Sequence, residues 1–313
     1  MPSFAAHLIK VYARLAIKRR SLNEHDLLRH LRRRFNHNPL PVRWPKGIHH
    51  DIVTMAGIKI DRVRPIAPQA TVLYIHGGGF VAGTTRTYFS WAGHVAQALK
   101  ADVYLPRYRL APEFAYPTAL DDVQGAYAEL LRTHPERPII VAGDSAGGAL
   151  MLALLLRLRD QAISMPVAGI AYSPYANLTT EPPSRITCQH SDDMLSLDML
   201  HTGRNFYLQG HDAHDPYASP SFGDFTGLPP LWLSASEHEC LRDDCLAVAN
   251  QAQHAGIKTE LVLRPHMPHV WPIFYPLLPE ARVDMQRVLD FISLCVKPRH
   301  SWRGYKHAVD CLF

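Results

Sequence analysis

A serine flanked by glycines, in the segment Gly143-Asp144-Ser145-Ala146-Gly147, is the feature of this 313-residue sequence that most clearly predicts chemistry. Residues 139–142 before it are apolar, which is typical of a buried parallel strand, and residues 149–158 after it are typical of a buried helix. So tight a turn requires small residues at 143 and 147, because side chains there would collide with the helix and the neighbouring strand. The pattern indicates a nucleophile elbow, which exposes the hydroxyl of Ser145 to a substrate. A chance glycine–serine turn is the alternative that this motif alone leaves open.

A run of glycines, His76-Gly77-Gly78-Gly79-Phe80, follows the strand-like residues 71–75. Glycines leave backbone N–H groups uncovered, so several of these groups can point at one place. Hydrolysis of an acyl bond builds negative charge on the carbonyl oxygen, and removing one preorganised donor to that oxygen costs about 2.7–4 kcal/mol. We expect an oxyanion hole formed by the N–H groups of Gly77, Gly78 and Ala146. A phosphate-binding loop is disfavoured, because no Gly-Lys-Ser/Thr sequence follows.

Three segments, His76-Gly-Gly-Gly-Phe80, Tyr108-Arg-Leu-Ala-Pro-Glu113 and Gly143-Asp-Ser-Ala-Gly-Gly148, together resemble the hormone-sensitive-lipase-like family of α/β-hydrolases, the bacterial family IV esterase type. The resemblance covers residues 70–293. It implies an α/β fold with a mostly parallel central sheet, flanking helices and a helical cap. It also implies a serine carboxylesterase that cleaves short-to-medium-chain acyl esters without a cofactor. An amidase or deacetylase with the same triad is the alternative, followed by a ligand-binding member of the fold that lacks the catalytic base.

The base should be a histidine near the C-terminal end of the chain. A serine hydroxyl needs a base to take its proton, and on this fold the order along the chain is serine, acid, histidine. His269 follows the last predicted strand and precedes Val270-Trp271, which is similar to the family's ending, so we expect His269 to be the base. His266 is the nearby alternative. His76 precedes the serine and is expected to hold its own loop in place.

The acid should follow the predicted strand 231–234. The segment Glu239-Cys-Leu-Arg-Asp-Asp244 is similar to the family's acid-x-Leu-x-Asp-Asp/Glu segment, so we expect Glu239 to orient the imidazole of His269. The family most often has Asp followed by Pro at this point, and the longer Glu side chain changes the reach. Glu237 and Asp243 therefore remain alternatives.

Two further charged residues lie within the motifs. Asp144, beside the nucleophile, is expected to face away from it and to accept structural hydrogen bonds. Arg107 stands where the family often has Asp, which leaves open how Arg109, Glu113 and Asp122 pair.

Strand-like and helix-like segments alternate along the chain, which predicts a parallel sheet covered by helices. The expected strands are 71–75, 102–105, 139–142, 169–173, 231–234 and 259–263, after an extended segment at 51–64; the expected helices include 91–100, 118–132 and 240–255. A helical stretch near 195–207 interrupts the alternation. We expect N-terminal cap helices at 1–48, a catalytic domain at 49–174 and 216–297, a cap insertion at 175–215 and a C-terminal tail at 298–313.

The N-terminal segment predicts two cap helices, the first amphipathic and the second opened by a capping box at 21–24. Because the apolar stripe of the first helix must be buried, we expect both parts of the cap to close over the serine with apolar side chains: Phe4, Leu8, Val11 and Tyr12 from the first part, and Leu195, Met199 and Phe206 from the second. A weak membrane contact through the same basic helix is the alternative.

The composition, 47% hydrophobic and 19% charged, is that of an ordinary globular protein. The net charge of +5 comes mostly from basic clusters near the ends, and no nucleic-acid-binding motif accompanies them, so no nucleic acid is expected. Five scattered cysteines, no signal peptide and no membrane-spanning apolar run favour a cytoplasmic protein. The segment 211–215 is rich in His and Asp but has no zinc motif, so no metal is expected. The expected partner is a small-molecule ester, and the sequence permits a homodimer.

Overall fold

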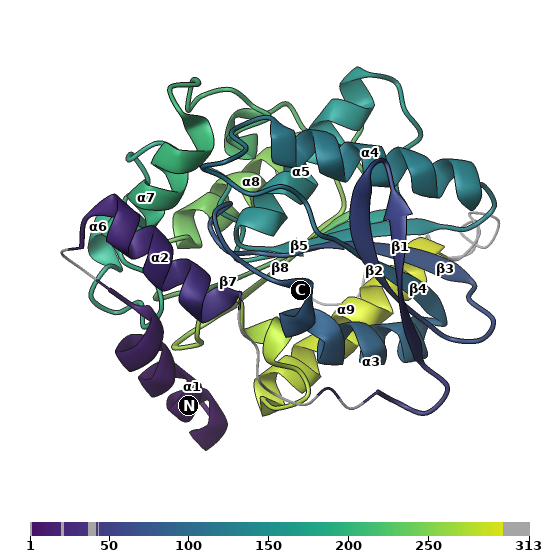
Figure 1. Ribbon diagram of the computed structural model, residues 1–313, viewed down its shortest axis with the longest axis horizontal. Coiled ribbons are helices and arrows are strands. Elements are labelled where there is room, and N and C mark those ends of the chain that lie inside the picture. The colour runs from purple at the N-terminus through teal and green to yellow at the C-terminus, as the bar shows by residue number, and fades with distance from the viewer. Residues whose placement is uncertain (1, 20–21, 37–41, 43, 297–313) are drawn as a thin grey trace, which may run out of the picture.

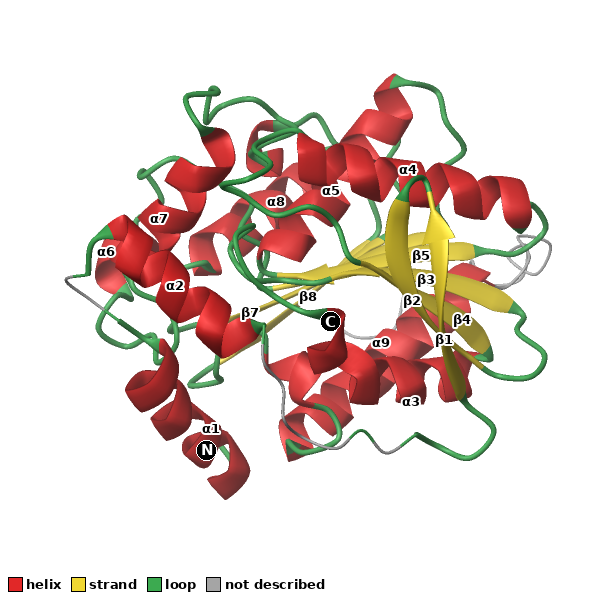
Figure 2. Cartoon of the chain, in the orientation of Figure 1, coloured by secondary structure: helices red, strands yellow, loops and turns green. Residues whose placement is uncertain are grey.

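The computed structural model describes residues 2–19, 22–36, 42 and 44–296, and within them eight strands form one sheet (Figure 2). Their order is β1-β2-β4-β3-β5-β6-β7-β8. β2 pairs antiparallel with β1 and β4, and all other neighbours pair in parallel. The strands are β1 (His49–Met55), β2 (Ile58–Arg64), β3 (Ala70–Ile75), β4 (Ala101–Pro106), β5 (Ile139–Asp144), β6 (Ala168–Tyr172), β7 (Leu231–Ser236) and β8 (Thr259–Arg264).

The sequence predicted this sheet closely. Each of the six expected strands overlaps one of β3 to β8, and the extended segment 51–64 folds into the hairpin of β1 and β2. Ala56 and Gly57 join that hairpin with positive φ angles of 48° and 82°, which a two-residue hairpin turn requires. The expected fold class, a mostly parallel sheet flanked by helices, is confirmed.

Helices cover both faces of the sheet (Figure 1). α4 (Thr118–Thr133), α5 (Ala146–Asp160) and α8 (Arg242–His254) lie on one face, and α3 (Phe89–Leu99) and α9 (Pro279–Val296) on the other. Side chains of each strand alternate between the two layers: Leu73 packs in the α5 layer and Val72 in the α3 layer. In the part of the chain that the structure describes, no helix is long and apolar enough to cross a bilayer.

The prediction that the first helix buries its apolar stripe is wrong. The stripe of α1 (Phe4–Tyr12) and of the π-helical turn after it (Ala13–Ile17) is 41–76% exposed and consists of Phe4, Leu8, Val11, Tyr12 and Leu15. The charges explain this orientation. Lys10 Nζ lies 3.2 Å and Arg14 Nη2 lies 2.8 Å from the carboxylate of Asp193, so the basic face turns toward the protein.

The second predicted helix, α2 (Glu24–Phe35), is present. Its N-cap is Asn23, whose Oδ1 accepts a hydrogen bond from the Asp26 N–H at 2.9 Å, while Ser21 of the expected capping box lies outside the described residues. α2 packs against α7 (Leu197–Leu208), so the two expected parts of the cap touch (Figure 1). Two single turns, α6 (Ser184–Thr187) and a 3₁₀ turn at Pro220–Phe222, complete this region. The expected tail, 298–313, lies outside the described residues.

Candidate active site

Ser145 stands at the turn from β5 into α5, with φ 51° and ψ −121°. The crowding predicted at the two glycines is present. A Cβ on Gly143 would lie 2.4 Å from the carbonyl oxygen of Gly147 in the helix, and a Cβ on Gly147 would lie 2.1 Å from that of Ile75 in the neighbouring β3. Only glycine fits these two positions, and the turn between them raises the serine out of the sheet.

Ser145 and His269 line the same cavity, which has a volume of about 900 Å³. Most of the wall is apolar. Its side chains come from the N-terminal helices, from the 175–215 segment and from the loop after β8: Tyr12, Ile17, Leu31, Phe35, Tyr175, Met194, Leu195, Met199, Leu200, Val270, Ile273, Phe274 and Leu277. A site that is largely apolar around a few polar groups is typical of a small-molecule pocket.

The expected cap contacts are therefore only partly right. Tyr12, Leu195 and Met199 line the cavity as predicted. The other members of the predicted set do not: Phe4, Leu8 and Val11 are exposed, and Phe206 packs against the ring of His25, with centroids 5.7 Å apart. Residues further along the N-terminal segment, from Ile17 to Phe35, take their place because α2, rather than α1, packs over the cavity.

The expected acid and base meet although they lie on different loops. Glu239 Oε2 lies 2.8 Å from His269 Nδ1, and the two residues are 1% and 4% exposed. Burial opposes protonation of the imidazole, but the charge and hydrogen bond of Glu239, with the charges of Asp192 and Asp144, outweigh it and raise the pKa of His269. Nε2 of His269 has no hydrogen-bond partner among the described residues, so this nitrogen is left to act on a group in the cavity.

None of the three alternatives lies in this arrangement. His266 is exposed and stacks on His238, with ring centroids 4.0 Å apart. Glu237 is exposed, and Asp243 pairs with Arg242 at 2.8 Å. The structure brings only Glu239 and His269 together.

The expectation that Gly77 donates to the oxyanion is wrong in this structure. The Gly77 N–H donates to Asp144 Oδ1 at 2.9 Å and to the Tyr88 hydroxyl at 3.1 Å. This N–H is therefore already bonded to two groups of the protein, one of them the residue beside the nucleophile, and is not left to donate to a substrate oxygen.

Gly79 lies outside the predicted set, and its N–H group is available where that of Gly77 is not. Gly78 and Gly79 both line the cavity, and among the described residues no acceptor is found for their N–H groups or for that of Ala146. The sequence does contain a third glycine in this run, Gly79. A run of three glycines, however, does not indicate which two of their N–H groups face the substrate.

Asp144 behaves as predicted. Its buried carboxylate accepts hydrogen bonds from the Gly77 N–H and from the hydroxyls of Tyr74 and Tyr88, both at 3.0 Å. Burial raises its pKa to about 6. His76 also holds its own loop, since its Nδ1 donates to the Gly77 carbonyl at 2.8 Å, and burial lowers its pKa to about 4, which keeps the ring neutral.

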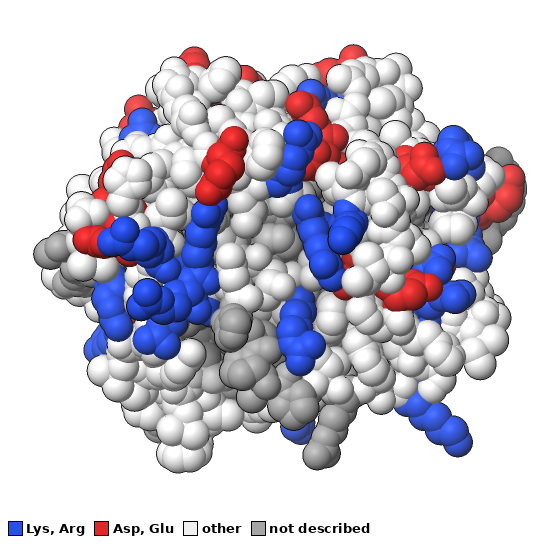
Figure 3. All heavy atoms as spheres, viewed as in Figure 1, with Lys and Arg blue, Asp and Glu red and all other residues white. Residues whose placement is uncertain are grey.

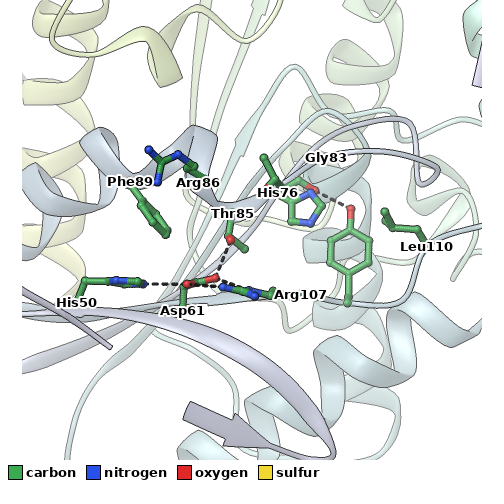
Figure 4. A pocket seen from close by; sticks show the side chains of 11 residues that line it. His50, Asp61, His76, Gly83, Thr85, Arg86, Phe89, Arg107 and Leu110 are labelled. Atoms are coloured by element: carbon green, nitrogen blue, oxygen red, sulfur yellow. Dashed lines mark hydrogen bonds and ion pairs between the residues drawn. The ribbon is translucent and has the colours of Figure 1, made fainter. Parts of the chain in front are cut away.

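Arg107 and the charged residues near it form three separate ion pairs. Arg107 binds both oxygens of the buried Asp61 at 2.7 and 2.9 Å, while Arg109 pairs with Asp122 and Glu113 with Arg32. Figure 4 shows His50 and Arg107 reaching Asp61 from opposite sides, with the Thr85 hydroxyl donating to it at 2.6 Å. This cluster lines a second cavity of about 410 Å³, which shares Gly83, Thr84 and Arg86 with the first. It fixes the segment that follows the glycine loop.

No group of three or more His, Cys, Asp or Glu side chains within the described ranges could hold a metal ion. His214 of the His- and Asp-rich segment is exposed and lies 3.3 Å from Asp212.

Residues 72–273 match the family described as alpha/beta hydrolase fold. An acetyl-hydrolase of Streptomyces hygroscopicus is 36% identical over 234 residues, which cover 74% of this chain and 78% of the relative. Carboxylesterase NlhH of Mycobacterium tuberculosis is 33% identical, over 78% of this chain and 74% of the relative. The solved structure of EstE5 is similar with a TM-score of 0.84 at 33% identity, covering 94% of this chain and 99% of that one.

An esterase from the bacterial hormone-sensitive lipase family has a TM-score of 0.84 at 30% identity, over 95% of this chain and all of that one. The motifs, the sheet and these similarities agree. The chain belongs to the hormone-sensitive-lipase-like family of α/β-hydrolases.

Proposed function

We propose that this carboxylic ester hydrolase cleaves short-to-medium-chain acyl esters through an acyl-enzyme on Ser145. The observation that carries the proposal is the buried Glu239–His269 pair, 2.8 Å apart, whose base lines the same cavity as Ser145. A serine, a base and an acid that holds the base are the parts that acyl transfer requires.

In the first half-reaction, His269 takes the proton of Ser145 while Oγ bonds to the ester carbonyl carbon. Glu239 holds the imidazole by Nδ1 and stabilises the imidazolium that forms. The N–H groups of Gly78, Gly79 and Ala146 donate to the oxygen that becomes negative. The bond from carbon to the alkoxy oxygen then breaks, and His269 gives its proton to the departing alcohol.

In the second half-reaction, water replaces the alcohol. His269 takes a proton from the water as it attacks the acyl carbon, and then returns the proton to Ser145 Oγ as the acid leaves. No step requires a cofactor or a metal.

The substrate range follows from the cavity. At about 900 Å³ and with a mostly apolar wall it has room for an acyl chain longer than acetyl. Curated relatives include an acetyl-hydrolase and an ethyl acetate hydrolase, whose names point to short acyl groups. An amidase or deacetylase would use the same residues, and a ligand-binding protein of this fold would lack turnover.

The deciding experiment is a panel of aryl esters with increasing acyl length, measured beside an anilide of the same acyl group. We expect turnover of the esters, with kcat/KM far above that of the anilide. A higher kcat/KM for the anilide would favour the amidase, and absence of turnover with every member would favour the ligand-binding protein.

We also propose that residues 1–48 and 175–215 form one cap over the catalytic domain, 49–174 and 216–297, and that its outer face makes weak contact with anionic membranes. Residues 1–48 carry 11 of the 33 Lys and Arg residues and two of the 28 Asp and Glu residues. Figure 3 shows Lys and Arg side chains gathered over α2, and the stripe on α1 is exposed. An exposed apolar stripe in a basic segment suits an anionic lipid surface.

Vesicle sedimentation tests this contact. We expect binding to vesicles containing phosphatidylglycerol, little binding to phosphatidylcholine vesicles, and loss of binding in Leu8→Glu. Ile66→Glu changes an equally apolar side chain, 81% exposed, far along the chain, and serves as the control. Equal binding of both variants would contradict the contact.

A cytoplasmic location and a homodimer are proposals as well. Cys188, Cys240, Cys245 and Cys295 are free thiols, which suits a reducing compartment. Fractionation of the native host and light scattering of the purified protein would test the two proposals.

A further inference from the structure

Both backbone polar groups of Cys240, the residue that follows Glu239, are hydrogen-bonded. The Cys240 N–H donates to Asp192 Oδ2 at 2.8 Å. The Cys240 carbonyl accepts hydrogen bonds from Ser184 Oγ at 2.7 Å and from Arg185 Nη1 at 2.6 Å. All three partners belong to the 175–215 segment, so this segment, and not the central sheet, fixes the backbone beside the acid.

The carboxylate of Asp192 also binds the backbone of two residues in the cavity wall. Asp192 is 3% exposed, and its Oδ1 accepts hydrogen bonds from the N–H groups of Met194 and Leu195, both at 2.8 Å. Met194 and Leu195 line the cavity that contains Ser145. One buried carboxylate thus joins the loop of the acid to the pocket wall.

We infer that Asp192 is a positioning residue for catalysis, which sets the place of Glu239 through the backbone of Cys240 and couples that place to the cap. The inference rests on the proposed function, because it assumes that Glu239 and His269 act on Ser145.

The side chain of Glu239 has few hydrogen-bond partners of its own, so its position depends on the backbone that carries it. Besides His269, its carboxylate accepts one hydrogen bond from the described residues, that of the Ser236 N–H at 3.3 Å. A displacement of about 1 Å at a catalytic group can cost about 100-fold in rate. Holding both the N–H and the carbonyl of Cys240 limits such a displacement.

The N-terminal segment also holds the backbone around Asp192. Lys18 Nζ donates to the carbonyls of Gln189, at 2.8 Å, and of Asp192. The neighbouring Asp193 pairs with Lys10 on α1 and with Arg14 on the turn after it, and among the described residues no hydrogen bond or ion pair links Asp193 to residues 236–241. Residues from both parts of the cap therefore contact the backbone at Asp192.

Asp192 also acts through its charge. The imidazole of His269 is faced by the charged groups Glu239, Asp192 and Asp144; burial opposes its protonation, and these three together raise its pKa. Replacing Asp192 by a neutral residue should therefore lower the pKa of His269, which a residue that only supports the fold would not do.

The experiment compares Asp192→Asn with Asp193→Asn, two changes of equal charge at adjacent positions. An asparagine at 192 can keep one acceptor oxygen but loses the other, so the donors of Cys240, Met194 and Leu195 cannot all be satisfied. We expect kcat per titrated active site to fall about 10- to 100-fold in Asp192→Asn, and the acid limb of its pH profile to move to lower pH. Asp193→Asn should leave both unchanged.

If the kcat and the acid limb of Asp192→Asn match those of Asp193→Asn, the inference is overturned. Circular dichroism checks the fold of each variant. Should Asp192→Asn fail to fold, Ser184→Ala decides, since it removes one donor to the Cys240 carbonyl without changing the charge. We expect that variant to lose severalfold in kcat with an unmoved acid limb, and an unchanged kcat would overturn the inference.

The two proposals fail separately. Activity retained in Ser145→Ala would refute the proposed function whatever the result at Asp192. An inactive Ser145→Ala beside an Asp192→Asn that resembles Asp193→Asn would refute only the positioning role.

Discussion

The Gly77 N–H donates to the Asp144 carboxylate at 2.9 Å, although the two residues are 67 positions apart. The residue before the nucleophile thereby holds the start of the glycine loop, and the hydroxyls of Tyr74 and Tyr88 satisfy the same carboxylate. The place of Gly78 and Gly79 relative to Ser145 depends on this bond.

Removing that carboxylate should be costly. Asp144→Ala leaves two buried donors, the hydroxyls of Tyr74 and Tyr88, without a partner, while the Gly77 N–H keeps only the Tyr88 hydroxyl. At about 1–3 kcal/mol for each unsatisfied donor, we expect a loss of about 2 kcal/mol or more in the free energy of unfolding. Urea denaturation measures it. Asp121→Ala, which breaks only the half-exposed pair with Arg157, should cost less than about 1 kcal/mol. Similar losses in the two variants would contradict the role of Asp144.

A fluorophosphonate probe should label Ser145, because a serine beside a base is the group such probes react with. We expect Ser145→Ala to abolish labelling and to reduce kcat by about 10⁴–10⁶. Ser90 also lines the cavity, so Ser90→Ala is the matched control and should label normally. An adduct mapped to any other serine would overturn the assignment.

Glu239→Gln should reduce kcat strongly while the protein stays folded. A neutral amide neither selects the required tautomer of His269 nor stabilises its protonated form, and the equivalent change in a serine protease costs about 10⁴ in kcat. Glu237→Gln alters an exposed carboxylate two residues away and should be close to wild type. If the two variants exchanged these behaviours, the acid would have to be reassigned.

The pH profile of kcat/KM should report His269. Activity falls with decreasing pH as the imidazole becomes protonated, since only the neutral ring accepts the proton of Ser145. Burial alone would lower the pKa of His269, but the charges of Glu239, Asp192 and Asp144 raise it. The acid limb of the profile should therefore lie above the ordinary histidine value of about 6.5. A limb near pH 4, where His76 titrates, would show that another group controls activity.

The acyl-chain profile should rise through short chains, peak at short-to-medium length and fall for long chains. Each buried CH₂ contributes up to about 0.8 kcal/mol until the cavity is full. Met199→Trp should move the peak to shorter chains, because Met199 lines the cavity, whereas Leu8→Trp on the exposed stripe should not. A preference for emulsified long-chain triglyceride, or equal profiles for the two variants, would contradict this account of the pocket.

The strands, the elbow and the candidate acid and base could be predicted from the sequence, the first two because they depend on local pattern. Gly143 and Gly147 indicate a turn that only glycine permits, and apolar runs at regular spacing indicate buried strands. His269 and Glu239 could be placed because the fold imposes the chain order of its catalytic groups.

Tertiary contacts decided what local pattern leaves open. Periodicity showed that α1 has an apolar face and a basic face, but the pairing of Lys10 and Arg14 with Asp193, more than 170 residues away, determined which face is outside. The three glycines after His76 look alike in sequence, and only the bonds of the Gly77 N–H to Asp144 and Tyr88 distinguish Gly77 from the two glycines of the proposed oxyanion hole. The support of Glu239 by Asp192 joins residues 47 positions apart and has no sequence signal, since the energy of a buried carboxylate depends on the donors that the folded chain brings to it.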